Sequence, residues 1–129
     1  MKKIILSSKN APQAIGPYSQ GIRAGDFIFC SGMIPVDPIS GNIPSTIEEQ
    51  TNLVIRNIQA FLEDNSSSLQ DIVKTTLFIK DMNSFPKINE IYGGYFTGNQ
   101  PARSTVEVSR LPKDVLIEIE CIAVMSEPY

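Results

Sequence analysis

An arginine and two glutamates near the end of the chain have the types and spacing that best fit chemistry on a small acid. Arg103 follows a Pro-Ala pair in PARSTVEV, and Glu118 and Glu120 interrupt the isoleucines of LIEIECIAV. A guanidinium binds a carboxylate through two parallel hydrogen bonds, which fix its orientation as well as its charge. A nearby glutamate can hold or activate water as a general base. These residues therefore predict a site for a small carboxylate.

Each candidate side chain also has an ordinary structural explanation. Arg103 fits a surface or interface ion pair, and the pattern alone favours that explanation. Glu118 and Glu120 fit an inter-subunit ion pair or charges at an interface rim, and the pattern does not decide between these roles and chemistry. Packing suits Tyr18 and Tyr92, a turn suits Ser31 and Gly32, and a helix surface suits Asn89.

The composition excludes several classes of protein. The chain has 129 residues, no histidine and a formal net charge of −3. Its basic residues are scattered, whereas nucleic-acid binding needs clustered positive charge. Without histidine, and without a CxxC spacing at Cys30 and Cys121, the usual zinc ligand sets are missing, and no GxGxxG, P-loop or GxSxG motif is present. We expect reduced, buried cysteines, no metal and no cofactor.

The length and hydropathy indicate one domain over residues 1–129. A chain of this size can bury enough surface to fold without disulfides or a metal. MKKIILSSK has too few apolar residues for the core of a signal peptide, and no later run approaches membrane-spanning length. We therefore expect a single-domain cytoplasmic protein.

Strand and helix patterns alternate, which predicts a mixed sheet with helices on one side. Residues 10–26 are rich in glycine and proline and are expected to form a loop that continues into extended chain. The expected strands lie near residues 4–6, 26–32, 33–42 with its turn, 74–80, 104–109 and 115–125.

Two amphipathic helices are expected. Ser45 and Glu48 form a candidate capping box for the first, and apolar side chains then recur at helical spacing over positions 47–62. The second helix is expected to begin near Ser84, with a proline in its first turn, and to end near Phe96.

The final strand predicts that the protein associates with itself. Alternation along residues 115–125 gives one wholly apolar side and one side on which Glu118 and Glu120 lie among large aliphatic residues. Two helices cannot cover both sides, and exposed apolar area favours association at about 25 cal/mol per Å². If the LPKD turn joins residues 104–109 to this strand as an antiparallel hairpin, Arg103 and Glu118 meet on the outer face near a subunit boundary.

Several motifs, taken in order, closely resemble the RidA family, also called YjgF and, by an older label, the L-PSP endoribonuclease group. The resemblance covers nearly the whole chain through NAPQAIGPYSQGI, SGMIPVDPISG, DIVKTTLFIKDM, FPKINEIY, PARSTVEVSRLPKDV and IEIE. It implies a chorismate-mutase-like α+β fold, with a mixed six-stranded sheet backed by two helices and a homotrimer with a central barrel and inter-subunit clefts. It also implies cofactor-independent hydrolysis of 2-iminopropanoate and 2-iminobutanoate, which arise from 2-aminoacrylate and 2-aminocrotonate, to 2-keto acids and ammonia.

The resemblance also assigns roles to residues of this sequence. Arg103 matches the residue that binds the substrate carboxylate, and Glu118 matches the residue that positions the attacking water. Glu120 matches a glutamate with a structural role. The residues that match the lining of the same cleft are Tyr18, Ser31, Gly32, Asn89 and Thr105.

Two departures from the family pattern concern this cleft. Thr105 stands where several bacterial relatives have cysteine, which excludes thiol chemistry there, and the loop at Gly98–Gln100 is shorter than theirs. The shorter loop bears on which imine fits. Two other functions stay open: a non-catalytic trimer that binds 2-keto acids or amino-acid metabolites, and the ribonuclease of the older label, which the scattered basic residues disfavour.

Overall fold

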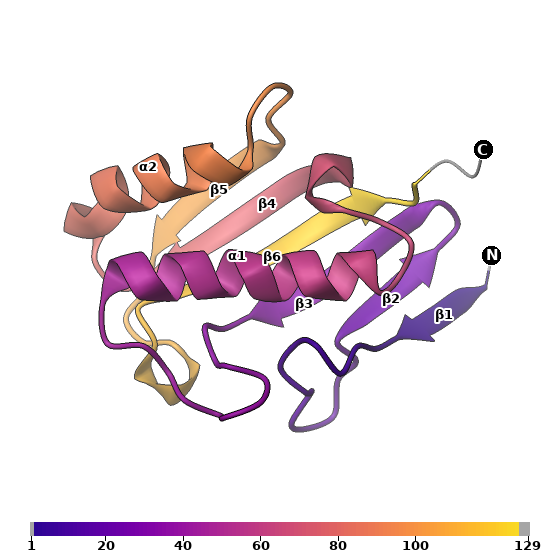
Figure 1. The fold of residues 1–129 in the computed structure, drawn as a ribbon, viewed down its shortest axis with the longest axis horizontal. Helices are drawn as coiled ribbons and strands as arrows, with labels where there is room; N and C mark the ends of the chain where they lie inside the picture. Colours follow the sequence, from indigo (N-terminus) through magenta and orange to yellow (C-terminus); the bar gives the residue numbers. More distant parts are fainter. Residues whose placement is uncertain (1, 127–129) are drawn as a thin grey trace.

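The computed structural model describes residues 2–126 as a six-stranded mixed sheet covered on one face by two helices (Figure 1). The strands are β1 (Lys3–Leu6), β2 (Gly21–Ala24), β3 (Phe27–Met33), β4 (Ile72–Ile79), β5 (Ala102–Glu107) and β6 (Ile117–Val124). The helices are α1 (Ile47–Glu63) and α2 (Phe85–Tyr95), which pack against each other. This arrangement confirms the predicted α+β fold.

The sheet order is β1-β2-β3-β6-β4-β5. β6 pairs antiparallel with both β3 and β4, and the edge strand β5 pairs parallel with β4. The expected hairpin between β5 and β6 is therefore wrong. Both edges of β6 are already hydrogen-bonded, so β5 takes the free edge of β4 instead, and the chain after β5 must cross β4 before β6 begins.

The segment after β3 also differs from the expectation. Residues 34–42 contain no strand and form a closed turn. In this turn Asp37 N donates to the carbonyl of Asn42 at 2.8 Å, and Gly41 N donates to the carbonyl of Asp37 at 2.9 Å. The proline and glycine residues of this segment favour such turns over a sheet ladder. The strand that the sequence analysis expected here is absent, and the extended chain before β3 is the short strand β2.

Both helices lie where the periodicity predicts, although their caps differ. Thr46 caps α1 by accepting from Glu49 N at 3.2 Å, so the capping pair lies one residue after the expected Ser45 and Glu48. The two candidate pairs have the same spacing, and the sequence pattern does not separate them. Ser84 precedes α2 as expected, but its side chain makes no capping hydrogen bond.

The core lies between the helices and one face of the sheet. α1 buries the predicted apolar stripe, with Phe61 fully enclosed, and β6 contributes Ile117 and Ile119. Burying such a side chain contributes about 1.5–3 kcal/mol. Cys30 and Cys121 face each other across β3 and β6 and are free and buried, which confirms the expectation.

The other face of the sheet carries apolar side chains that nothing within residues 2–126 covers. Phe27 and Phe29 are each 45% exposed, and Val106 is 43% exposed. An uncovered apolar surface of this kind is typical of an interaction site. It supports the homo-oligomer expected from the sequence, which stays a prediction.

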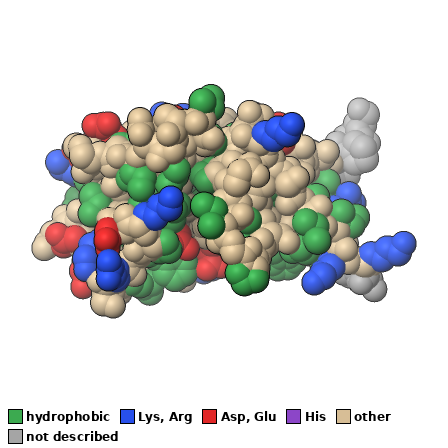
Figure 2. Space-filling view, turned by 90° about the horizontal axis from the view of Figure 1, so that it is seen from below, with side chains coloured by type: hydrophobic (Ala, Val, Ile, Leu, Met, Phe, Trp, Pro, Cys, Tyr) green, Lys and Arg blue, Asp and Glu red, His purple; other side chains and the backbone are tan. Residues whose placement is uncertain are grey.

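Charged side chains of both signs are interspersed on the surface. Figure 2 shows no continuous field of one sign on the face that it presents. Within the described part of the chain, Lys87 pairs with Glu48 at 3.1 Å and Arg110 pairs with Asp114 at 2.7 Å. Neither α-helix in this range has the length and apolar run needed to cross a membrane.

Candidate active site

Arg103 extends from the edge strand β5 toward α2. Its Nη1 donates to Oδ1 of Asn89 at 2.8 Å. Its Cζ lies 5.2 Å from the ring centroid of Phe85 and 5.0 Å from that of Tyr92, at positions where ring faces attract a cation. No acidic side chain within residues 2–126 pairs with Arg103. Its remaining donors are therefore available to a ligand.

A hollow of about 450 Å³ opens beside this guanidinium. It is lined by Asn89, Tyr92, Gly93, Gln100, Pro101 and Arg103. Phe85, Asn89 and Tyr92 lie four and three positions apart, so α2 presents them on one face. The sequence pattern suits Tyr92 to packing and gives Phe85 no role in a site, although this spacing is visible in the sequence.

Thr105 lies two residues beyond Arg103, on the same side of β5 and opposite Leu77 of β4. Its hydroxyl is buried and has no hydrogen-bond partner among the described residues. Gln100, from the short loop, lines the hollow and donates to the carbonyl of Phe96 at 3.3 Å. The loop that the sequence analysis singled out therefore borders the space next to Arg103.

A second group of predicted residues lies at the end of β3. Tyr18, Ser31 and Gly32 line a cavity of about 440 Å³ between the loop before β2 and the turn after β3. Ser31 Oγ donates to the carbonyl of Ser19 at 2.6 Å, which fastens that loop to β3. Tyr18 is 52% exposed, so about half of its surface is left open on the wall of this cavity.

Gln20 holds the loop that carries Tyr18. Its side chain is buried, and its Oε1 accepts from Ser8 N at 2.8 Å. Its Nε2 donates to the carbonyls of Ser8 and Pro12 at 3.1 and 2.8 Å. Gln20 was not among the residues predicted from the sequence, because a buried glutamine beside a loop has no periodic signal.

A β-bulge brings Gly32 against Glu118. The register of β3 on β6 shifts between Cys30 and Met33, which is the local distortion that a bulge produces. A Cβ on Gly32 would lie 1.9 Å from Glu118 Oε2, so the approach requires glycine. Burial, reinforced by the charge of Glu120, raises the pKa of the Glu118 carboxyl. A raised pKa suits a carboxylate that accepts a proton near neutral pH.

The two groups do not meet within one chain. Arg103 lies on the helix side of the sheet, whereas Glu118 lies between the buried Ile117 and Ile119 and therefore points to the other side. β4 separates their strands. The prediction that both reach the outer face is wrong, because α2 covers the side of β5 on which Arg103 lies.

We call Arg103, Asn89 and Thr105 the arginine half, and Tyr18, Ser31, Gly32 and Glu118 the glutamate half. Glu120 is exposed on the same side of β6 as Glu118 and belongs to neither half. Across residues 2–126, no three Cys, Asp or Glu side chains gather in a way that could hold a metal ion. The arginine half can bind a planar anion, and the glutamate half can orient a water and accept its proton.

Two sequence comparisons relate the chain to known proteins. A RutC family protein of Pyrococcus horikoshii is 56% identical over 124 residues, which cover 95% of this chain and 98% of that protein. The 2-iminobutanoate/2-iminopropanoate deaminase of Escherichia coli strain K12 is 48% identical over 122 residues, which cover 92% of this chain and 95% of the enzyme.

The fold and a family model agree with these relatives. The crystal structure of E. coli TdcF with bound serine has a TM-score of 0.91 at 46% identity, and the match covers 95% of this chain and 99% of that one. The model of the endoribonuclease L-PSP family matches residues 8–125. The chain therefore belongs to the RidA (YjgF) family, which that model describes.

Proposed function

We propose that the protein hydrolyses 2-imino acids, among them 2-iminopropanoate and 2-iminobutanoate, to 2-keto acids and ammonia in the cytoplasm without a cofactor. The observation that carries the proposal is the guanidinium of Arg103, which Asn89 and two rings hold beside a hollow with no acidic partner within residues 2–126. A small carboxylate complements such a fork. The serine bound to TdcF and the name of the E. coli deaminase support the same class of ligand.

We further propose that the complete site forms between two copies of the chain. The arginine half and the glutamate half lie on opposite sides of the sheet, so one copy cannot apply both to the same small molecule. The exposed apolar face supports association, and a closed ring of three copies gives each arginine half a neighbouring glutamate half. This is the homotrimer that the family resemblance implies.

The proposed chemistry requires few groups. A protonated imine is already electrophilic, so orientation and a poised water supply most of the acceleration. Arg103 fixes the carboxylate of the 2-imino acid. Glu118 takes a proton from a water molecule while the oxygen of that water bonds to C2 of the substrate. Glu118 then returns that proton to the nitrogen, the carbon–nitrogen bond breaks, and the hydroxyl proton leaves with ammonia as ammonium. The products are the 2-keto acid and ammonium, and Glu118 is again a carboxylate.

A dehydratase-coupled assay tests the proposal. A serine or threonine dehydratase generates the imine, and the rate of 2-keto acid formation is compared with spontaneous hydrolysis. We expect acceleration by the wild-type protein and its loss in Arg103→Ala and Glu118→Gln. Arg110→Ala is the matched control, because Arg110 is an exposed arginine paired with Asp114 outside both halves. No acceleration, or full activity in Arg103→Ala, contradicts the proposal.

A binding protein without turnover is the second candidate. The TdcF structure favours it in one respect, since serine is an amino acid and not an imine. Calorimetric binding of 2-oxobutanoate that depends on Arg103, together with no imine hydrolysis, would establish this function instead. RNA cleavage is a weaker candidate because basic side chains do not cluster, and cleavage that disappears in Arg103→Ala would revive it.

A further inference from the structure

The guanidinium of Arg103 is fixed on three sides. Phe85 and Tyr92 place ring faces about it, with centroids 5.2 and 5.0 Å from Cζ. Asn89 Oδ1 accepts from Nη1 at 2.8 Å, which sets the rotation of the guanidinium plane. The edge that remains free is the edge that a two-oxygen anion would use.

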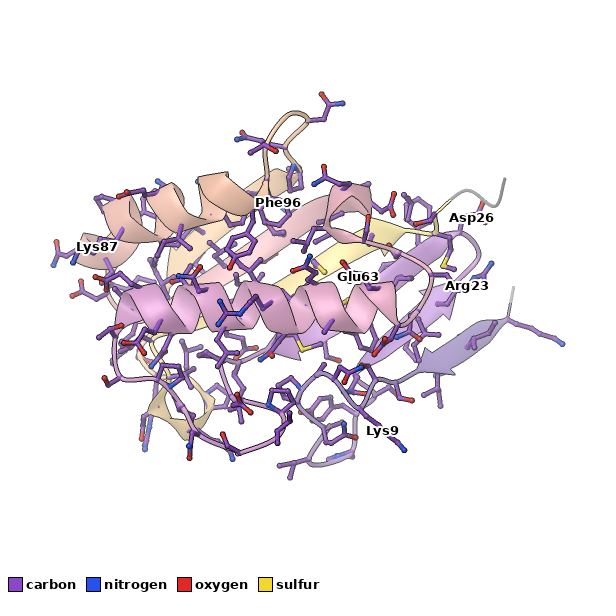
Figure 3. The ribbon with its side chains drawn as sticks, in the orientation of Figure 1. Lys9, Arg23, Asp26, Glu63, Lys87 and Phe96 are labelled. Atoms are coloured by element: carbon purple, nitrogen blue, oxygen red, sulfur yellow. The ribbon has the colours of Figure 1, made fainter. Side chains whose placement is uncertain are left out.

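Tyr92 is itself held in place. It is 5% exposed, and its hydroxyl lies 2.7 Å from Oγ1 of Thr75, which is 1% exposed. The ring of Phe96, labelled at the end of α2 in Figure 3, packs against it with centroids 4.4 Å apart and planes tilted by 35°. Burial raises the pKa of the Tyr92 hydroxyl, so this group stays neutral and keeps its hydrogen bond. A continuous contact therefore runs from β4 through Tyr92 to the charge of Arg103.

We propose that Tyr92 is the positioning residue of the carboxylate clamp and that Thr75 is its anchor. This inference deepens the proposed function and rests on it. An arginine that is free to rotate loses side-chain rotamer entropy when a ligand fixes it. An arginine already held against a fixed ring gives up less, and the ligand then binds more tightly.

The test uses four variants and 2-oxobutanoate as the probe. Tyr92→Leu removes the ring, whereas Tyr92→Phe and Thr75→Val keep the ring and remove the anchoring hydrogen bond. Tyr95→Phe is the matched control, because it also removes a tyrosine hydroxyl from α2. The Tyr95 hydroxyl donates to Asn52 at 2.8 Å, away from Arg103. Calorimetry gives Kd for 2-oxobutanoate, and the dehydratase-coupled assay gives KM and kcat.

We expect Tyr92→Leu to raise Kd and KM about tenfold or more, since a partly desolvated cation–π contact is lost. Tyr92→Phe and Thr75→Val are expected to raise them by about fivefold at most, through a net hydrogen bond of ordinary strength. We expect a smaller change in kcat than in KM, and no change in either value in Tyr95→Phe.

A second ligand separates positioning from loss of packing. 2-Oxobutanamide has nearly the shape of 2-oxobutanoate without its charge, so the ratio of the two Kd values reports the clamp. We expect the ratio of the acid's Kd to the amide's Kd to rise in Tyr92→Leu. A general loosening of the fold weakens both ligands equally, and that result would overturn the inference, as would unchanged 2-oxobutanoate binding in Tyr92→Leu.

Three other outcomes of these experiments also bear on the role given to Tyr92. If Tyr92→Leu does not fold, Tyr92→Phe and Thr75→Val carry the test, and wild-type values for the acid-to-amide ratio in both overturn the inference. If the wild-type protein binds 2-oxobutanoate but does not hydrolyse imines, the proposed function fails while the positioning role is still measured by Kd. If wild-type protein does not bind 2-oxobutanoate, the clamp itself is refuted.

Discussion

Replacing Gly32 with alanine moves the group that we assign to the attacking water. The added Cβ would lie 1.9 Å from Glu118 Oε2 and 2.8 Å from Cδ, whereas ordinary contact begins at 3.4 Å. Oε2 must therefore move by about 1.5 Å, and a misplacement of about 1 Å costs on the order of 100-fold in rate. Gly32 is not among the residues with positive φ, so alanine fits the backbone and the strain falls on the carboxylate.

We expect Gly32→Ala to lower kcat/KM for imine hydrolysis by about 100-fold, which corresponds to about 2.7 kcal/mol of transition-state stabilisation. The free energy of unfolding is expected to fall by no more than about 1–3 kcal/mol, the usual range for an added methyl group in a packed site. Gly94→Ala is the control, since Gly94 has open space around it. Wild-type kcat/KM in folded Gly32→Ala would refute the role given to Glu118.

Three further predictions concern stability. Gly94→Ala should raise the free energy of unfolding, measured by urea denaturation, by about 1 kcal/mol, because alanine favours the helix more than glycine does. A decrease would mean that α2 requires glycine at this position. Thr46→Ala should lower it by about 1 kcal/mol through loss of the α1 cap, and an unchanged urea midpoint would argue against that cap. Hydrogen bonds from Ser8 and Asn10 lower the pKa of Asp64 in the folded protein. The ionised Asp64 therefore stabilises the fold fully above the ordinary pKa of 3.8, and this stabilisation is lost as the pH falls through the lower pKa of the folded state. Melting temperatures across acidic pH should therefore fall less steeply in Asp64→Asn, and parallel curves would contradict this.

The elements that the sequence predicts well are those set by local pattern. The apolar stripe of α1 and the limits of α2 follow from helical spacing, and the alternation in β6 separates buried Ile117 from Glu118. The partner of β5 depends on which sheet edge is free after β6 has paired on both sides, and no local pattern carries that information. The expected hairpin failed for this reason.

The candidate site was likewise predictable from the sequence only in part. The identities of Arg103 and Glu118 could be read from residue type and family resemblance, but the side of the sheet that each occupies could not. Tyr92 has an ordinary packing pattern, and its support of Arg103 depends on how α2 lies over β5. The closeness of Gly32 to Glu118 requires a bulge in β3, which moves one residue out of the regular register.

Mixing two inactive variants tests whether the arginine half of one copy acts with the glutamate half of another. Arg103→Ala and Glu118→Gln are each expected to be inactive in imine hydrolysis. When they are co-expressed and assemble at random in closed rings, about a quarter of the interfaces contain both intact halves, so we expect about a quarter of wild-type activity. A mixed sample as inactive as its two components, despite mixed assembly shown by mass spectrometry, would refute a site shared between copies.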